Sequence, residues 1–181
     1  MFRYIKQMLR CSALKSATKK SSGRKMSAHN LDSARTIGVM APCKFDADNN
    51  ALKRLKKMAR DNKIELTSIT YYLSDKLPDN VISDPGKILF SNKECNWFGK
   101  PTASEVQNFI RSELDILIDL TSEECFPMHY IVVASKASFK IGRCAYANNP
   151  YDFMIASGRS MSDDEFIQTL SAYLSKFEQN K

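Results

Sequence analysis

The chain has 181 residues, of which 43% are hydrophobic and 26% charged, a composition typical of one globular domain. Its longest apolar runs are far shorter than the roughly 20 residues needed to span a bilayer, and no secretory signal is expected because the amino terminus has no apolar core. Its five cysteines are odd in number and widely spaced, a pattern that suggests neither a disulfide framework nor a CxxC metal knuckle and indicates reduced thiols in a cytoplasm-like compartment.

The net charge of +7 is concentrated at the amino terminus. Eight of the 27 basic residues and none of the acidic ones lie in residues 1–30, so the remainder holds 19 basic and 20 acidic side chains, a net charge of −1. An anionic partner is therefore expected for this segment rather than for the domain. The eight basic residues predicted to contact an anionic surface are Arg3, Lys6, Arg10, Lys15, Lys19, Lys20, Arg24 and Lys25.

Residues 1–12 fit a basic amphipathic helix, with Phe2, Ile5 and Leu9 on one side. Residues 15–29 are polar and basic, which favours a flexible linker. We therefore predict a tail and linker over residues 1–30 and a domain over residues 31–181.

The rest of the chain alternates strand-like and helix-like segments. Strands are expected from their β-branched and apolar runs, and helices from apolar residues at helical spacing. The expected strands are 36–41, 64–73, 87–91, 115–120, 138–142 and 152–156. The expected helices are 47–62, 103–112, about 122–135 and 163–177.

Three of these helix starts match the S/T-x-x-E capping box, in which a hydroxyl and a carboxylate satisfy amides at the helix start. The matching pairs are Thr102 with Glu105, Thr121 with Glu124, and Ser162 with Glu165. Pro127 would interrupt a helix capped at Thr121, which favours an irregular 121–126 segment and a helix beginning with Pro127.

The alternation predicts a single Rossmann-like, doubly wound, mostly parallel sheet of about six strands with helices on both faces. In such sheets ligands bind outside the carboxyl ends of the strands. The five loops expected there are Ala41–Phe45, Asn92–Lys100, Thr121–Cys125, Gly142–Cys144 and Ser157–Arg159.

Residues 115–143 contain the candidate ligand-binding side chains. These are Asp119, Thr121, Glu123, Glu124, His129 and Arg143. One interpretation is an acid–base cluster of His129 with the carboxylates at 119, 123 and 124, with Cys125 as nucleophile. The other is structural: Glu124 caps, Asp119 accepts hydrogen bonds at the rim of the sheet, and His129 packs at a helix start that lowers its basicity.

Other features leave alternatives open. Cys43, Cys95, Cys125 and Cys144 all follow expected strands, which would suit zinc or thiol chemistry, but small core fillers are the commoner use of free cysteine. Trp97 either contacts a partner or anchors its loop. None of the six glycines forms a phosphate-binding motif, so we expect no nucleotide cofactor, and no metal is assigned.

The segments "DILIDLT", "FPMHYI" and "FKIGR" resemble those of an uncharacterised family of small bacterial α/β proteins, over roughly residues 30–177. That resemblance implies no known activity. In topology, the same region is similar to the amino-terminal Rossmann half of heptosyltransferase-like glycosyltransferases. The loop after the first strand lacks the Gly-Asp of those enzymes, and a second domain is absent, so only the topology is carried over.

These observations favour a non-enzymatic binding or scaffolding domain whose basic amino-terminal segment contacts a membrane or a nucleic acid. The alternative is a small enzyme or ligand-binding domain with its site at residues 119–129 and Arg143. A protein groove as partner for the segment, a merely solubilising tail, and a mitochondrial presequence stay open. The expected location is cytoplasmic and peripheral to the membrane.

Overall fold

The computed structural model describes residues 2–42, 50–75, 86–146, 148–155 and 161–176. It contains one six-stranded sheet in the order β3-β2-β1-β4-β5-β6, and every adjacent pair of strands is parallel. The strands are β1 (Thr36–Pro42), β2 (Glu65–Tyr72), β3 (Lys87–Ser91), β4 (Ile116–Asp119), β5 (Phe139–Gly142) and β6 (Phe153–Met154). This confirms the predicted Rossmann-like α/β fold.

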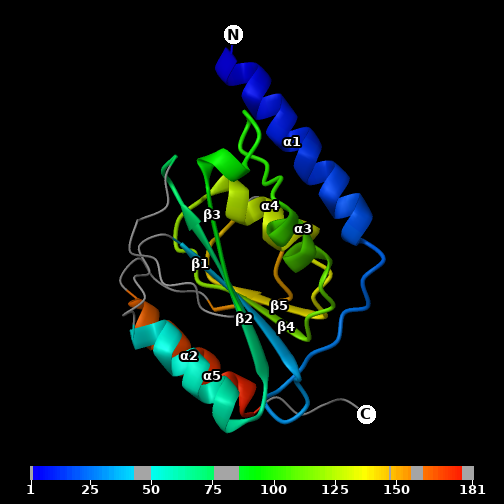
Figure 1. Cartoon of the computed structure of the whole chain (residues 1–181). Helices are drawn as coiled ribbons and strands as arrows, with labels where there is room; N and C mark the ends of the chain where they lie inside the picture. The colour runs from blue at the N-terminus through cyan, green and yellow to red at the C-terminus, as the bar shows by residue number, and fades with distance from the viewer. Residues whose placement is uncertain (1, 43–49, 76–85, 147, 156–160, 177–181) are drawn as a thin grey trace.

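Helices cover both faces of the sheet (Figure 1). One face packs on α2 and α5, and the other packs on α3 and α4, with α1 outside α4. The helices are α1 (Phe2–Ser21), α2 (Asn50–Asp61), α3 (Ser104–Arg111), α4 (Phe126–Ala134) and α5 (Asp163–Leu174), and a short 3₁₀ turn, η1, spans Asn92–Glu94.

The central strands are apolar on both sides because both of their faces are covered. In β1, Ile37 and Val39 pack with the α2 and α5 side, whereas Met40 packs with the α3 and α4 side. In β4, Ile118 and Leu117 divide between the two sides in the same way. The near-continuous apolar runs of the sequence are therefore explained by two cores, one on each face of the sheet.

The helix starts agree only in part with the predicted capping boxes. Ser162 and Glu165 form the predicted box at α5, since the Glu165 amide donates to Ser162 Oγ over 3.2 Å and the Ser162 amide donates to Glu165 Oε2 over 2.8 Å. The box at Thr102 is wrong. The helix there begins at Ser104 after an uncapped Ala103, because the Thr102 hydroxyl donates to Glu94 O instead.

The box at Thr121 and Glu124 is also wrong. The Thr121 hydroxyl donates to Asp119, and α4 begins only at Phe126, after Cys125. Pro127 lies in the first turn of α4, where its missing amide costs no hydrogen bond. An irregular segment before the helix was therefore predicted correctly, although the helix begins one residue before Pro127.

The amino-terminal helix is longer than predicted. It continues to Ser21, so the first part of the expected linker at residues 15–29 is helical. Ala13, Leu14, Ala17 and Ser21 recur at helical spacing and pack against the core on the α4 side, with Ala17 fully buried. The packing of these side chains on α4 stabilises the helix, although the polar residues around them in the sequence indicated a linker.

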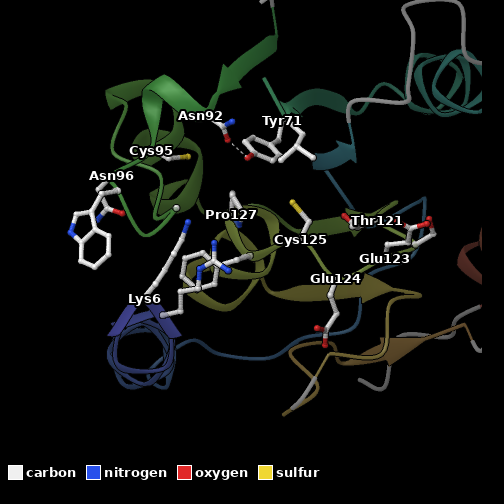
Figure 2. Close-up of a pocket in the computed structure, with 16 residues that line it drawn as sticks. Lys6, Tyr71, Asn92, Cys95, Asn96, Thr121, Glu123, Glu124, Cys125 and Pro127 are labelled. Carbon is white, nitrogen blue, oxygen red and sulfur yellow. Dashed lines mark hydrogen bonds between the residues drawn. The ribbon is translucent and has the colours of Figure 1, made fainter. Parts of the chain in front are cut away.

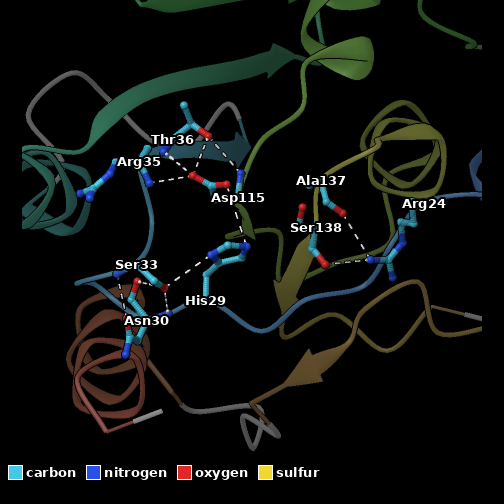
Figure 3. Close-up of polar contacts among 9 residues, drawn as sticks. All are labelled: Arg24, His29, Asn30, Ser33, Arg35, Thr36, Asp115, Ala137 and Ser138. Carbon is cyan, nitrogen blue, oxygen red and sulfur yellow. Dashed lines mark hydrogen bonds and ion pairs between the residues drawn. The ribbon is translucent and has the colours of Figure 1, made fainter. Parts of the chain in front are cut away.

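The remainder of that linker is tied to the amino end of the sheet (Figure 3). Arg24 donates to Ala137 O and Ser138 O over 3.3 and 3.1 Å and pairs with Asp152. The Ser27 amide donates to the same Ser138 carbonyl over 3.1 Å. The prediction of a flexible linker is therefore wrong for this part of the chain, because the backbone carbonyls just before β5 provide acceptors that the local sequence does not reveal.

The connection into β1 is anchored by Asp115, which lies just before β4. Its Oδ2 accepts the amides of Arg35 and Thr36 over 2.6 and 3.0 Å, and His29 lies 3.9 Å from Oδ1. Burial acts to raise the pKa of Asp115, but these hydrogen bonds outweigh it and the pKa is lowered. Asp115 therefore joins the ends of two neighbouring strands.

Candidate functional site

A cleft of about 640 Å³ lies between α1 and the carboxyl end of the sheet (Figure 2). It lies in the region where doubly wound sheets bind their ligands, and its volume is within the usual range for ligand pockets. Four segments of the chain line it: α1, residues 71–73 at the end of β2, residues 92–99 after β3, and residues 121–127 after β4. Two of the five predicted loops, Asn92–Lys100 and Thr121–Cys125, thus border the cleft, whereas Cys43 and the loop Ser157–Arg159 lie outside the described residues.

The α1 side of the cleft carries two cations at helical spacing, Lys6 and Arg10. Arg10 Nε donates to Phe98 O over 2.7 Å, and its guanidinium lies 4.7 Å from the centre of the Phe126 ring. A side chain at position 99 would crowd that guanidinium, and Gly99 also has φ of +94°, which only glycine adopts readily. Arg10 is therefore held in place by contacts from two other segments.

The second wall is the loop after β3, which is ordered by its own hydrogen bonds. The Asn96 amide donates to Lys100 O, and the Lys100 amide donates to Asn96 Oδ1, each over 2.9 Å. Tyr71 donates to Asn92 Oδ1 over 2.5 Å. Trp97, at the tip of the loop, is 57% exposed and stacks edge-on to its neighbour Phe98 at 5.7 Å. The loop is anchored without burying its tryptophan.

The third wall is the β4–α4 corner. Thr121, Glu123 and Glu124, three of the predicted site residues, border the cleft there. In Figure 2 the Lys6 amine points into the cleft, whereas the carboxylates of Glu123 and Glu124 point away from it. Of these three charged groups, only the Lys6 amine is therefore directed at the cleft.

Asp119, a fourth predicted site residue, has no exposed surface and does not line the cleft. Its carboxylate accepts the Thr121 amide over 2.9 Å, the Thr121 hydroxyl, and the Tyr151 hydroxyl over 2.7 Å. Burial raises the pKa of Asp119 to about 6, although these hydrogen bonds and the nearby Arg143 act in the other direction. The prediction that it accepts hydrogen bonds is confirmed, but it does so in the interior.

Arg143 and His129 do not reach the cleft. Arg143 is buried, donates to Leu120 O over 3.0 Å, pairs with Asp163 and lies over the Phe166 ring. His129 stacks on Tyr146 at 4.1 Å beside a smaller cavity of about 350 Å³ between α1 and α4. The pKa of His129 is lowered, as predicted, but burial is the main cause rather than the helix start.

The cysteines of the described residues lie in different surroundings. Cys95 and Cys125 border the cleft, whereas Cys144 is buried. Burial raises the pKa of both Cys95 and Cys144 to about 11, which keeps these thiols protonated at neutral pH. Within the described part of the chain, no group of three or more His, Cys, Asp or Glu side chains is placed to hold a metal ion.

Sequence reasoning assigned Lys6 and Arg10 to a tail and so did not place them in the cleft. Nothing in the local sequence pairs α1 with residues almost ninety positions further on. The basic residues predicted to contact an anionic surface fall into two groups. Arg10 and Arg24 donate hydrogen bonds to main-chain oxygens. The side chains exposed along α1 are Arg3, Lys15, Lys19 and Lys20. In the described residues no helix is long and apolar enough to cross a membrane.

Comparison with known proteins adds one match. No curated protein and no solved structure matches the chain, so the similarity to heptosyltransferase-like glycosyltransferases is not confirmed. One family model matches residues 6–177, which include most of α1 together with every strand of the sheet. The expectation of an uncharacterised family is thereby confirmed: the chain belongs to DUF6913, a family of unknown function.

Proposed function

We propose that this protein is a non-enzymatic α/β domain that attaches peripherally to an anionic membrane surface, with α1 as its contact element. One observation carries the proposal. The first two turns of α1 expose Phe2, Tyr4, Ile5 and Met8, with exposed fractions of 83%, 72%, 43% and 57%. Large apolar side chains gathered at one end of a folded chain mark a surface that meets lipid or a partner.

The position of this end supports membrane contact. The second half of α1 is docked on α4, and the amino-terminal end of the helix extends beyond the body of the domain (Figure 1). Trp97 lies beside it, because Trp97 and Lys6 line the same cleft. Tryptophan favours the boundary between lipid and water. Nine large apolar side chains are exposed among the described residues, and five of them belong to this contact end, which comprises Phe2, Tyr4, Ile5, Met8 and Trp97.

The charge of α1 favours an anionic bilayer as the partner. The helix contains no acidic residue, and Arg3 and Lys6 flank the apolar side chains. Each basic residue near an anionic surface contributes about 1 kcal/mol, and each apolar side chain that enters the interface contributes on the order of 1–2 kcal/mol. Nucleic acid would use the same charge but would leave the aliphatic side chains in water, which is why we propose a membrane.

The interior polar groups support a non-enzymatic role. Asp119 and Arg143, two of the candidate ligand-binding residues of the sequence, are engaged with other protein groups and are buried. We propose that the domain is cytoplasmic and that its attachment to the membrane brings the cleft close to the lipid surface.

Vesicle flotation tests the proposal. The full chain is expected to float with vesicles of equal parts phosphatidylcholine and phosphatidylglycerol and to float poorly with phosphatidylcholine alone. The double variant Phe2→Ser, Ile5→Ser removes exposed side chains only and should lose most of the binding. The matched control Met26→Ser, Met154→Ser alters exposed apolar residues elsewhere and should keep it.

A second pair of variants tests the charge. Arg3→Gln should weaken binding, whereas Lys57→Gln on the exposed side of α2 should not. If the unaltered chain ignores anionic vesicles, or if it binds RNA with the same loss in the Phe2→Ser, Ile5→Ser variant, the membrane function is wrong.

A further inference from the structure

The cleft between α1 and the carboxyl end of the sheet contains a partly buried cation, Lys6. Lys6 is partly buried at the cleft wall, and within the part of the chain that the structure describes it has no ion-pair partner. Figure 2 shows its amine pointing into the cleft. A half-buried ammonium loses hydration, so an anion that enters the cleft gains more from it than from an exposed lysine.

Asn96 adds a neutral donor to the same region. Its Oδ1 already accepts the Lys100 amide over 2.9 Å, so its side-chain NH₂ is the group left for a ligand. Because this bond fixes which side-chain atom is the oxygen, the donor role of the amide follows from the fold of the loop. Asn92 is arranged similarly, since its Oδ1 is occupied by the Tyr71 hydroxyl.

Arg10 supplies the second charge. Its Nε is used by Phe98 O, while the contact with the Phe126 ring holds the guanidinium plane. The terminal nitrogens of such a fixed guanidinium suit the paired oxygens of a phosphate. The wall of the cleft formed by α1 and residues 92–99 is therefore rich in donors, whereas the acidic Glu123 and Glu124 belong to the other wall.

We infer that this cleft binds a phosphate group, held by Lys6, Arg10 and Asn96. The volume of about 640 Å³ exceeds that of a phosphate alone, and the exposed Trp97 and Leu73 at its border would contact an apolar remainder of the ligand. A phosphorylated lipid headgroup and a soluble phosphate ester share this chemistry. The lipid as natural source rests on the membrane function proposed above, whereas phosphate recognition does not.

Calorimetric titration of the full chain without vesicles tests phosphate recognition directly. The probes are glycerol 3-phosphate, short-chain phosphatidic acid below its micelle concentration, and glycerol as the neutral control. Lys6→Gln should weaken binding by at least about tenfold, the equivalent of one charge-assisted hydrogen bond. Asn96→Asp keeps the acceptor for the Lys100 amide but places a carboxylate against the phosphate, and it should abolish binding.

Two controls separate this inference from the proposed function. Lys19→Gln removes an exposed cation of the same helix outside the cleft and should leave the affinity unchanged. The double variant Phe2→Ser, Ile5→Ser should lose vesicle binding and keep glycerol 3-phosphate binding.

The result identifies the source of the phosphate. Binding of both phosphate probes supports a soluble ester, and binding of phosphatidic acid alone supports a lipid headgroup. The inference is overturned if neither probe binds, or if Lys6→Gln and Asn96→Asp both leave the affinity unchanged.

Discussion

The pH dependence of stability tests the buried position of Asp119, because a buried carboxylate with a raised pKa takes up a proton on folding. The carboxylate has no exposed surface, and its pKa moves from 3.8 to about 6 on folding. A folded pKa above the unfolded one means that the folded state takes up a proton between these values. This group therefore favours folding more as the pH falls from 6 towards 4.

The size of the effect follows from the shift of about two pKa units, which corresponds to about 3 kcal/mol when the pH is below both values. Between pH 7 and pH 4, about 2 kcal/mol of it should appear. The variant Asp119→Asn keeps an acceptor for the Thr121 amide but cannot titrate. Relative to this variant, the unaltered protein should gain that amount of stability on acidification.

Urea unfolding at a series of pH values measures the difference in free energy of unfolding between the two proteins. The other carboxylates contribute equally to the free energies of unfolding of the two proteins, so their contributions cancel in the difference. Asp115→Asn provides a control of opposite sign: the pKa of Asp115 is lowered on folding, so the unaltered protein should lose stability relative to that variant as the pH falls. A constant difference between Asp119→Asn and the unaltered protein across this pH range would refute the assignment of a buried, proton-accepting Asp119.

Two further predictions concern β5. A Cβ at position 142 would overlap the Tyr151 ring, so Gly142→Ala should destabilise the protein by about 2 kcal/mol or more in thermal unfolding, whereas Gly23→Ala, with no atom within 4 Å, should change stability by less than about 0.5 kcal/mol. Lys140 is buried with its amine 2.7 Å from Val132 O, and burial lowers its pKa from 10.5 to about 7. Relative to Lys140→Met, the unaltered protein should therefore gain stability as the pH rises from 7 to 10, because the unfolded state holds the extra proton; parallel curves in urea unfolding would contradict this.

The order of strands and helices was accessible from the sequence because it depends on local periodicity. Strand β3 was predicted with both its bounds, and the cap of α5 with both its residues, since Ser162 and Glu165 are three positions apart and act on each other. The apolar run of β4 indicated a strand covered on both faces before any partner was known.

The candidate site was only partly accessible. Thr121 and Glu124 were placed correctly at the carboxyl edge of the sheet, but the same pattern suggested a capping box that the Thr121 hydroxyl does not form. An acidic residue at the end of a strand gives the same sequence pattern whether its side chain lies at the rim of the sheet or in the interior. The buried Tyr151 hydroxyl, more than thirty residues further on, is what holds Asp119 inside.

The sequence by itself determined that this protein is an alternating α/β domain with a strongly basic first thirty residues, because charge and periodicity are local properties. Only the tertiary structure decided that residues 2–21 form a docked helix, that Lys6 and Arg10 line a cleft together with the β4–α4 corner, and that Phe2 and Trp97 belong to one exposed end. Contacts between distant segments depend on how helices pack over the sheet, and that packing is set by all the apolar faces together rather than by any one of them.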